Sequence, residues 1–126
     1  MGIQLEPPLG KRILLVEDER SVRDTLRQLL RLDDHTVVEA NNGAEALGLF
    51  TQDQFDVVLT DYIMPFFNGT ELAGRIKKLV PNQPVIMITG HGIKPRRHHG
   101  VDAVLRKPFD LDQLRSALTE VLLVPV

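Results

Sequence analysis

Five short apolar runs constrain the fold of this chain more than any other feature of its sequence. They are rich in valine and isoleucine, and most of them do not alternate with polar residues. Strands that are covered on both faces, as in a parallel sheet, have this composition. The runs cover residues 13–16, 36–38, 57–59, 85–88 and 101–105.

Amphipathic helical patterns separate most of these runs. Apolar residues recur at helical spacing within residues 22–30, 72–79 and 111–121. Helix starts are indicated by an Asn or Asp that is followed three residues later by a Glu or Gln, which can return the capping hydrogen bond. These pairs are Asn42 with Glu45, Asn68 with Glu71, and Asp110 with Gln113.

The alternation of strands and helices predicts the topology. A strand–helix unit repeated five times favours a parallel sheet with right-handed crossovers. We therefore expect an α/β fold, a doubly wound five-stranded parallel sheet of the flavodoxin-like type, with a shortened or irregular fourth helix.

The fourth crossover, TGHGIKPRRHHG at residues 89–100, is close to the minimum length for a parallel connection. It spans 12 residues, and such crossovers need about 10–12 residues or more. Pro95 suits the first position of a helix, and Gly100 suits the residue just past a helix end. We expect about one helical turn, from Pro95 to His99.

The same crossover gathers histidines and cations. His91, His98 and His99 could form a zinc site because imidazoles bind zinc, but adjacent histidines on a short helix point in different directions. A solvated or partner-facing role is favoured. For the three cations between residues 94 and 97, a phosphate or nucleic-acid patch competes with a solvated surface, which is the more common outcome on a net-acidic domain.

Length and composition limit the classes of function. The chain has 126 residues, 43% hydrophobic content and a formal net charge of -2, which fits one domain and gives no electrostatic case for nucleic acid or a membrane surface as the main partner. The absence of cysteine excludes disulfides and thiolate chemistry. No apolar run approaches the ~20 residues of a membrane span, and the first residues do not resemble a signal peptide. We expect a cytoplasmic domain over residues 11–126, preceded by a linker or remnant at residues 1–10.

Polar residues at the carboxyl ends of the predicted strands carry the chemistry. Ligands of open α/β sheets bind at this edge. The residues delivered there are Glu17 and Asp18, Asp61, Thr89 and Lys107. Converging carboxylates repel each other unless a cation lies among them, and oxygen ligands favour Mg²⁺. The pattern indicates an acid-bound metal, a further carboxylate free to attack, and two groups that stabilise phosphoryl charge.

Four motifs resemble the receiver domain of two-component response regulators, the CheY-like family. "ILLVEDE" resembles the first strand and acidic pair, "DVVLTDYIMPFFNGTEL" the third strand and phosphoacceptor loop, "PVIMITG" the fourth strand with its hydroxyl residue, and "KPF" the lysine–proline after the fifth strand. The resemblance runs from about Lys11 to Val121. It implies a signalling domain rather than an enzyme. Such a domain catalyses only its own phosphorylation and dephosphorylation.

The resemblance also implies partners and a metal. A histidine kinase or a histidine phosphotransfer domain would donate the phosphoryl group to Asp61, and a downstream protein, unidentified from the sequence, would respond. The Mg²⁺ ligands would be Asp18, Glu17 directly or through water, Asp61, and the main-chain carbonyl of Ile63. Nucleic-acid binding and membrane insertion by the domain itself are not implied.

The remaining roles fall on two strand ends. Thr89 would bond a phosphoryl oxygen, and Lys107 would pair with the phosphoryl charge. The Lys107–Pro108 peptide bond is expected to be cis, a form that only X–Pro bonds adopt at low cost. Phosphorylation would draw in Thr89 and shift the loop that follows it, so that a local change in charge biases a two-state element.

Three departures from the family pattern stand out. Val104 occupies the position, three residues before the lysine, where the family usually has its switch aromatic. Ile63 and His91 occupy the positions that flank the hydrolytic water, and Ile63 cannot orient a water by hydrogen bonding, which predicts slow self-dephosphorylation. Thr89 and Lys107 are 18 positions apart, about four fewer than the family usually has.

Two other classes of α/β protein do not fit these residues. A flavodoxin-type cofactor binder needs small donors after its first strand, whereas Glu17 and Asp18 would repel a phosphate. A haloacid-dehalogenase-type phosphatase needs a second aspartate where Ile63 lies. The alternative that stays open is a pseudo-receiver, a phosphorylation-independent interaction module. The sequence leaves open whether the domain stands alone or is part of a hybrid kinase or larger regulator.

Overall fold

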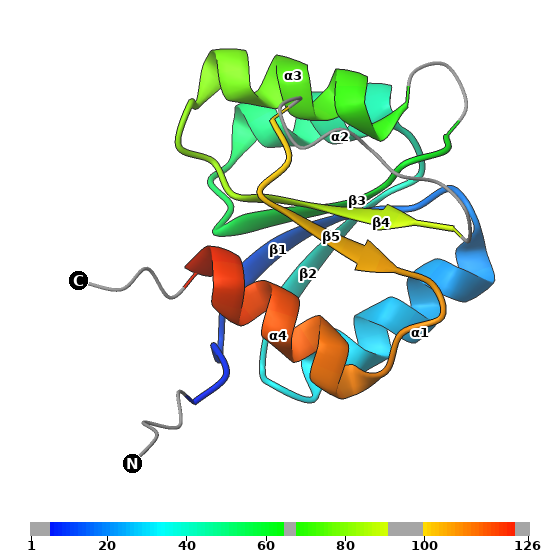
Figure 1. Ribbon diagram of the computed structural model, residues 1–126. Coiled ribbons are helices and arrows are strands. Elements are labelled where there is room, and N and C mark those ends of the chain that lie inside the picture. Colours follow the sequence, from blue (N-terminus) through cyan, green and yellow to red (C-terminus); the bar gives the residue numbers. More distant parts are fainter. Residues whose placement is uncertain (1–5, 65–67, 91–99, 123–126) are drawn as a thin grey trace.

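The computed structural model describes residues 6–64, 68–90 and 100–122, which contain one sheet covered by helices on both faces (Figure 1). The strands are β1 (Arg12–Val16), β2 (Thr36–Ala40), β3 (Val57–Asp61), β4 (Val85–Thr89) and β5 (Ala103–Arg106). Their spatial order is β2-β1-β3-β4-β5, and every neighbouring pair is parallel. The doubly wound five-stranded sheet is therefore confirmed.

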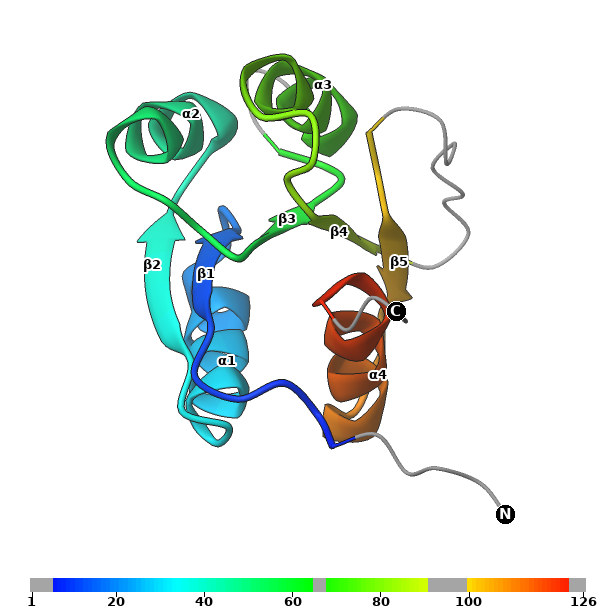
Figure 2. The same cartoon turned by 90° about the vertical axis from the view of Figure 1, so that its left-hand side faces the viewer.

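Four helices lie within the described residues. They are α1 (Arg20–Arg31), α2 (Gly43–Gln52), α3 (Gly69–Leu79) and α4 (Leu111–Leu122). Helices α1 and α4 cover one face of the sheet, and α2 and α3 cover the other (Figure 2). The label α4 belongs to the helix after β5. The short turn predicted between residues 95 and 99 lies outside the described residues.

The two helical layers explain why the apolar runs do not alternate. In β1, Leu14 and Val16 belong to the core under α2 and α3, whereas Ile13 and Leu15 belong to the core under α1 and α4. All four side chains are fully buried. Because both faces of a central strand are covered, both sets of its side chains have to be apolar.

The predicted caps define the helix starts. Asn68 and Glu71 form a complete capping box at α3. Asp110 and Gln113 exchange hydrogen bonds of 2.8 and 2.9 Å in the same reciprocal way before α4. At α2 only half of the prediction is confirmed: Asn42 accepts from the Glu45 amide, but Asn41, not Asn42, donates to the Glu45 carboxylate.

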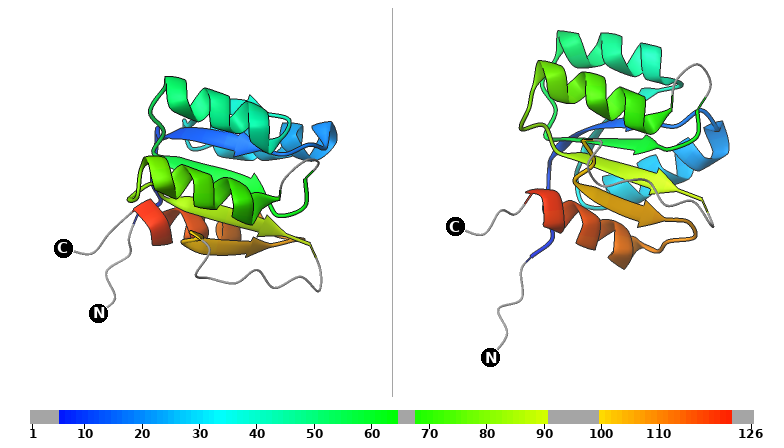
Figure 3. Two further views of the ribbon diagram at one scale, coloured as in Figure 1. Left: turned by 90° about the horizontal axis from the view of Figure 1, so that it is seen from above. Right: turned by 45° about the horizontal axis from the view of Figure 1, so that its top comes forward.

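The strand ends position the residues of interest. The last residue of β3 is Asp61, and the last residue of β4 is Thr89. The carboxyl ends of the strands all point to the same side of the molecule, away from the labelled chain ends (Figure 3). Parallel pairing thus brings residues that are distant in sequence to one edge of the sheet.

Gly69 allows α3 to start close to that edge. Its amide donates to the Tyr62 carbonyl at 2.8 Å. A Cβ at this position would overlap the main-chain oxygen of Asp61 and the sulfur of Met87. Only glycine permits this approach, because the oxygen belongs to the backbone and cannot move aside.

The segment before β1 is partly described. Pro8 is buried, and the Gly10 amide donates to the Asp33 carbonyl at 3.0 Å. The assignment of residues 1–10 as a linker stays a prediction. Within the described part of the chain, no helix has the length and apolar character to cross a membrane.

Candidate functional site

Three carboxylates meet at the carboxyl edge of the sheet. Glu17 and Asp18 follow the last residue of β1, and Asp61 is the last residue of β3, its neighbour in the sheet. One carboxylate oxygen from each of the three lies within 4.8 Å of the other two. The structure therefore brings together the three acids that the sequence placed at this edge.

Glu17 is the most perturbed member of the cluster. Its side chain is 1% exposed, and burial, followed by the negative charge of Asp61, raises its pKa to about 8. Its Oε1 accepts a hydrogen bond of 3.2 Å from the Glu19 amide. Its Oε2 is buried and has no hydrogen-bond partner among the described residues. A cation bound among these groups would favour the ionised form of Glu17.

Lys107 supplies positive charge to the cluster. Its Nζ lies 3.6 Å from Oδ2 of Asp61 and 3.9 Å from Oε2 of Glu17. The loop after β5 is held in place because the Lys107 amide donates to the Thr89 carbonyl at 2.8 Å. The Lys107–Pro108 bond is cis, as the family resemblance implied.

Thr89 brings a hydroxyl to the same edge. The residue is fully buried, and its Oγ1 has no hydrogen-bond partner among the described residues. It lies at the end of β4, where its predecessor Ile88 pairs with Asp61 in the sheet. Because most buried hydroxyl groups are hydrogen-bonded, an unpaired one beside an acid cluster suggests a group that is satisfied only when a ligand is bound.

Of the two residues predicted to flank the hydrolytic water, Ile63 is described by the structure and His91 is not. The Ile63 side chain is 61% exposed and follows the phosphoacceptor candidate by two residues, so it offers no polar group there. His91 lies outside the described residues, as do His98, His99 and the three cations between residues 94 and 97.

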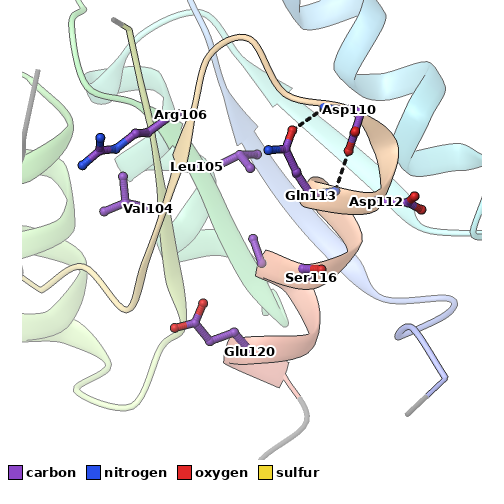
Figure 4. A pocket seen from close by; sticks show the side chains of 9 residues that line it. Val104, Leu105, Arg106, Asp110, Asp112, Gln113, Ser116 and Glu120 are labelled. Carbon is purple, nitrogen blue, oxygen red and sulfur yellow. Dashed lines mark hydrogen bonds between the residues drawn. The ribbon is translucent and has the colours of Figure 1, made fainter. Parts of the chain in front are cut away.

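Val104 lies on β5 and is one of the residues that line a surface groove. The groove lies between β5 and α4 and has a volume of about 510 Å³. Val104, Arg106, Asp110 and Glu120 line it with other residues of these elements (Figure 4). The short valine side chain is partly buried against the core under α2 and α3, so no large aromatic group occupies this position.

Two residues that position the site were not identified from the sequence. Arg23 of α1 donates a hydrogen bond of 2.9 Å to the main-chain oxygen of Glu17. Gly69 places the start of α3 against the carbonyl of Asp61. The Asn-Gly pair at the start of α3 was a visible signal for the glycine, whereas a contact to a main-chain oxygen leaves no mark in the sequence.

The fold and the site define a class of protein: a doubly wound α/β domain with acids, a lysine and a hydroxyl at the carboxyl edge of its sheet. The sequence profile described as "Response regulator receiver domain" matches residues 13–119. The chain belongs to this family, and it is a receiver domain of two-component signalling.

Curated relatives agree with this assignment. Response regulator MprA of Mycobacterium ulcerans is 33% identical over 118 residues, which cover 90% of this chain and 51% of that protein. The MprA of Mycolicibacterium vanbaalenii is 34% identical over 115 residues, which cover 88% of this chain and 50% of that protein. The chain spans about half the length of these relatives.

Solved structures agree as well. The response regulator TrrA of Thermotoga maritima, in complex with Mg²⁺–BeF, has a TM-score of 0.83 and 32% identity, covering 89% of this chain and 99% of that one. TrrA in complex with the histidine kinase ThkA gives a TM-score of 0.80 and 32% identity, covering 89% and 98%. CheY4 of Vibrio cholerae gives 0.83 and 27%, covering 90% and 99%.

Proposed function

We propose that this receiver domain accepts a phosphoryl group on Asp61 from a phosphohistidine, in a Mg²⁺-dependent step, and thereby switches its contact with a protein partner. The observation that carries the proposal is the position of the Lys107 ammonium, 3.6 Å from Asp61 and 3.9 Å from Glu17. A phosphoaspartate at this position would have a cation beside its new charge, which is the main requirement of phosphoryl transfer.

The transfer itself makes one bond and breaks another. A carboxylate oxygen of Asp61 attacks phosphorus, and the phosphorus–nitrogen bond of the phosphohistidine breaks. The electron pair of that bond stays on the imidazole, which takes up a proton. Lys107 pairs with the charge on the phosphoryl oxygens, and the hydroxyl of Thr89 donates to one of them. The domain thus catalyses only its own modification.

The donor set of the cluster fits Mg²⁺. All candidate ligands are oxygens: the carboxylates of Glu17, Asp18 and Asp61 and, as the family resemblance implies, the main-chain carbonyl of Ile63. Hard divalent cations prefer such ligands. The buried Oε2 of Glu17, which accepts no hydrogen bond from the described residues, supports a cation at this place. A bound Mg²⁺ would neutralise charge on the transferred group.

Phosphorylation with a small donor tests the proposal directly. Wild-type protein incubated with acetyl phosphate and Mg²⁺ should gain one phosphoryl group by mass spectrometry, and Asp61→Asn should gain none. Asp53→Asn is a matched control, since this exposed carboxylate pairs with Arg12 at the start of β1, at the other end of the sheet. An unmodified wild type would favour the pseudo-receiver, which the complete set of acids, lysine and threonine argues against.

The phosphoaspartate should be long-lived. Ile63 occupies the position that flanks the hydrolytic water in the family, and its exposed aliphatic side chain cannot orient a water molecule. We expect phosphorylated Ile63→Asn to lose its phosphoryl group faster than the phosphorylated wild type, because the amide can hydrogen-bond to water. Decay of the wild-type acylphosphate within seconds at neutral pH would contradict this proposal.

An apolar groove beside Lys107 suits the phosphodonor. It has a volume of about 420 Å³ and lies between α1 and the loop after β5. Its lining residues are Ser21, Val22, Thr25, Leu26, Leu29, Lys107, Pro108 and Phe109. We assign it to a helix of the histidine kinase or phosphotransfer domain, because a donor seated here is next to the residue that contacts Asp61. The related TrrA is known in complex with a histidine kinase.

A large charged side chain in this groove should block docking of the kinase without affecting the phosphorylation chemistry at Asp61. With a histidine kinase that phosphorylates the wild type, Thr25→Arg should slow transfer of the phosphoryl group to Asp61. Phosphorylation of the same variant by acetyl phosphate should stay unchanged. Gln28→Arg is the control, because Gln28 is exposed on the same helix but does not line the groove. Equal loss with both donors would mean that Thr25→Arg disturbs the site itself.

A further inference from the structure

Arg23 ties three elements together directly behind the acid cluster. Its Nη1 donates to the main-chain oxygen of Glu17 at 2.9 Å and to Oδ1 of Asn41 at 2.6 Å. Its Nε lies 3.6 Å from Oε1 of Glu39, and the arginine side chain is 13% exposed. One largely buried guanidinium therefore joins α1 to the ends of β1 and β2.

The contact to the Glu17 carbonyl fixes the direction of two carboxylates. The carbonyl of Glu17 and the amide of Asp18 belong to one planar peptide group. Holding its oxygen on Arg23 therefore fixes the orientation of that plane, from which the side chains of Glu17 and Asp18 depart. Glu17, Asp18 and Asp61 bring carboxylate oxygens within 4.8 Å of one another. Carboxylates this close disfavour each other's charge, so a connection that is not held would relax by moving them apart.

The neighbours of Arg23 keep it in this position. Nδ2 of Asn41 donates to Oε2 of Glu45 at 3.1 Å, which leaves Oδ1 of Asn41 free to accept from Arg23. Glu39 is shared with Arg27, whose Nη1 lies 3.2 Å from Oε1. Arg27 lies one turn further along α1, and its described contacts are to Glu39 and Asp24 rather than to the acid cluster.

We infer that Arg23 is a positioning residue for the Mg²⁺ site: it holds the β1–α1 connection so that Glu17 and Asp18 converge on Asp61. This inference rests on the proposed function, since it assumes that the three carboxylates bind Mg²⁺. Residues that orient metal ligands without touching the metal typically contribute a factor of about 10–100 to metal affinity.

Mg²⁺ titration tests the inference with two arginines of one helix. Tyr62, the only tyrosine in a chain without tryptophan, lies beside Asp61 and reports binding by its fluorescence. Arg23→Ala should weaken Mg²⁺ binding about tenfold, whereas Arg27→Ala should leave it unchanged, because the described contacts of Arg27 are to Glu39 and Asp24. Arg23→Lys should give an intermediate affinity, because an ammonium cannot reproduce all the contacts of a planar guanidinium.

Urea unfolding of the metal-free proteins separates positioning from stability. If Arg23→Ala and Arg27→Ala lose similar stability but only the former loses Mg²⁺ affinity, the inference holds. Equal Mg²⁺ affinities for wild type and Arg23→Ala, or equal losses for both variants, overturn it. If Arg23→Ala does not fold, Arg23→Lys carries the same comparison. A wild type that does not bind Mg²⁺ at all overturns the proposed function as well, so the two failures are distinguishable.

Discussion

Replacement of Glu17 by glutamine should stabilise the metal-free protein at neutral pH. The folded chain raises the pKa of this carboxyl from 4.5 to about 8, mainly because the group is buried and secondly because Asp61 repels its charge. Each unit of difference between folded and unfolded pKa corresponds to ~1.4 kcal/mol. At neutral pH most of this difference is expressed, so the expected gain in the free energy of unfolding is roughly 3 kcal/mol.

The sign of the pH dependence follows from proton binding. Between 4.5 and about 8 the folded protein keeps a proton on Glu17 that the unfolded chain has released. Wild-type stability should therefore fall as the pH rises through this window, and Glu17→Gln should remove that part of the decline. Urea unfolding in the presence of a chelator, from about pH 5 to about pH 8, measures the difference between the two proteins.

Asp18→Asn is the matched control for this experiment. It removes a carboxylate from the same connection, but the Asp18 side chain is exposed, so no comparable gain is expected. Parallel stability curves for wild type and Glu17→Gln across the whole window would refute the reasoning. Glu17→Gln should also weaken Mg²⁺ binding, because an amide is a poorer ligand than a carboxylate for a hard cation.

Three further substitutions test other parts of the fold. Gly69→Ala should destabilise the protein by about 1–3 kcal/mol through overlap with backbone, whereas Gly74→Ala in the same helix, which has no atom within 4 Å of an added Cβ, should be neutral or stabilising in urea unfolding; equal effects would contradict the close approach. Burial lowers the pKa of His35 below its ordinary 6.5, so stability should fall as the pH drops below that value. His35→Asn, which keeps a hydrogen-bond acceptor, should flatten this fall, and an unchanged pH profile would count against it. Arg115 makes two hydrogen bonds of 2.8 Å to the buried Asp33 and holds the pKa of that carboxyl below its ordinary value. Arg115→Ala should therefore lower the urea midpoint at neutral pH and lose this effect in acid, where Asp33 is protonated in both states; a pH-independent difference would argue for a packing role instead.

The sheet could be predicted from the sequence because strands that are buried on both faces consist of continuous apolar runs. Each strand core was recognised from apolar residues that face two helical layers, and the errors are confined to strand ends. At β5 the apolar run begins at Val101, but the strand begins at Ala103. Gly100 has a positive φ of 81°, and the chain becomes extended only after this turn, which the composition of the run does not reveal.

The candidate site was predictable to the extent that it consists of side chains at strand ends. Parallel topology alone brings Glu17, Asp18 and Asp61 together. The supporting contacts were not predictable, because they join separate segments and one of them is made to a main-chain oxygen. Arg23 reaches the carbonyl of a residue six positions away and the side chain of another 18 positions away, and any residue type offers the same carbonyl.

The buried hydroxyl of Thr89 should destabilise the metal-free protein until a ligand provides it with a hydrogen-bond partner. Burial of an unpaired hydroxyl costs about 1–3 kcal/mol in proteins, and the Thr89 hydroxyl has no hydrogen-bond partner among the described residues. Thr89→Val, which replaces the hydroxyl by a methyl of similar size, should stabilise the metal-free protein by about 1 kcal/mol. Thr60 is the control, since its equally buried hydroxyl donates to the Asp61 carbonyl at 3.1 Å; Thr60→Val should destabilise by about 1 kcal/mol. Addition of Mg²⁺ and beryllofluoride, which stands in for the phosphoryl group, should stabilise the wild type more than Thr89→Val. If Thr89→Val instead destabilises the metal-free protein as Thr60→Val does, the hydroxyl has a partner in the resting state and is not held in reserve for the phosphoryl group.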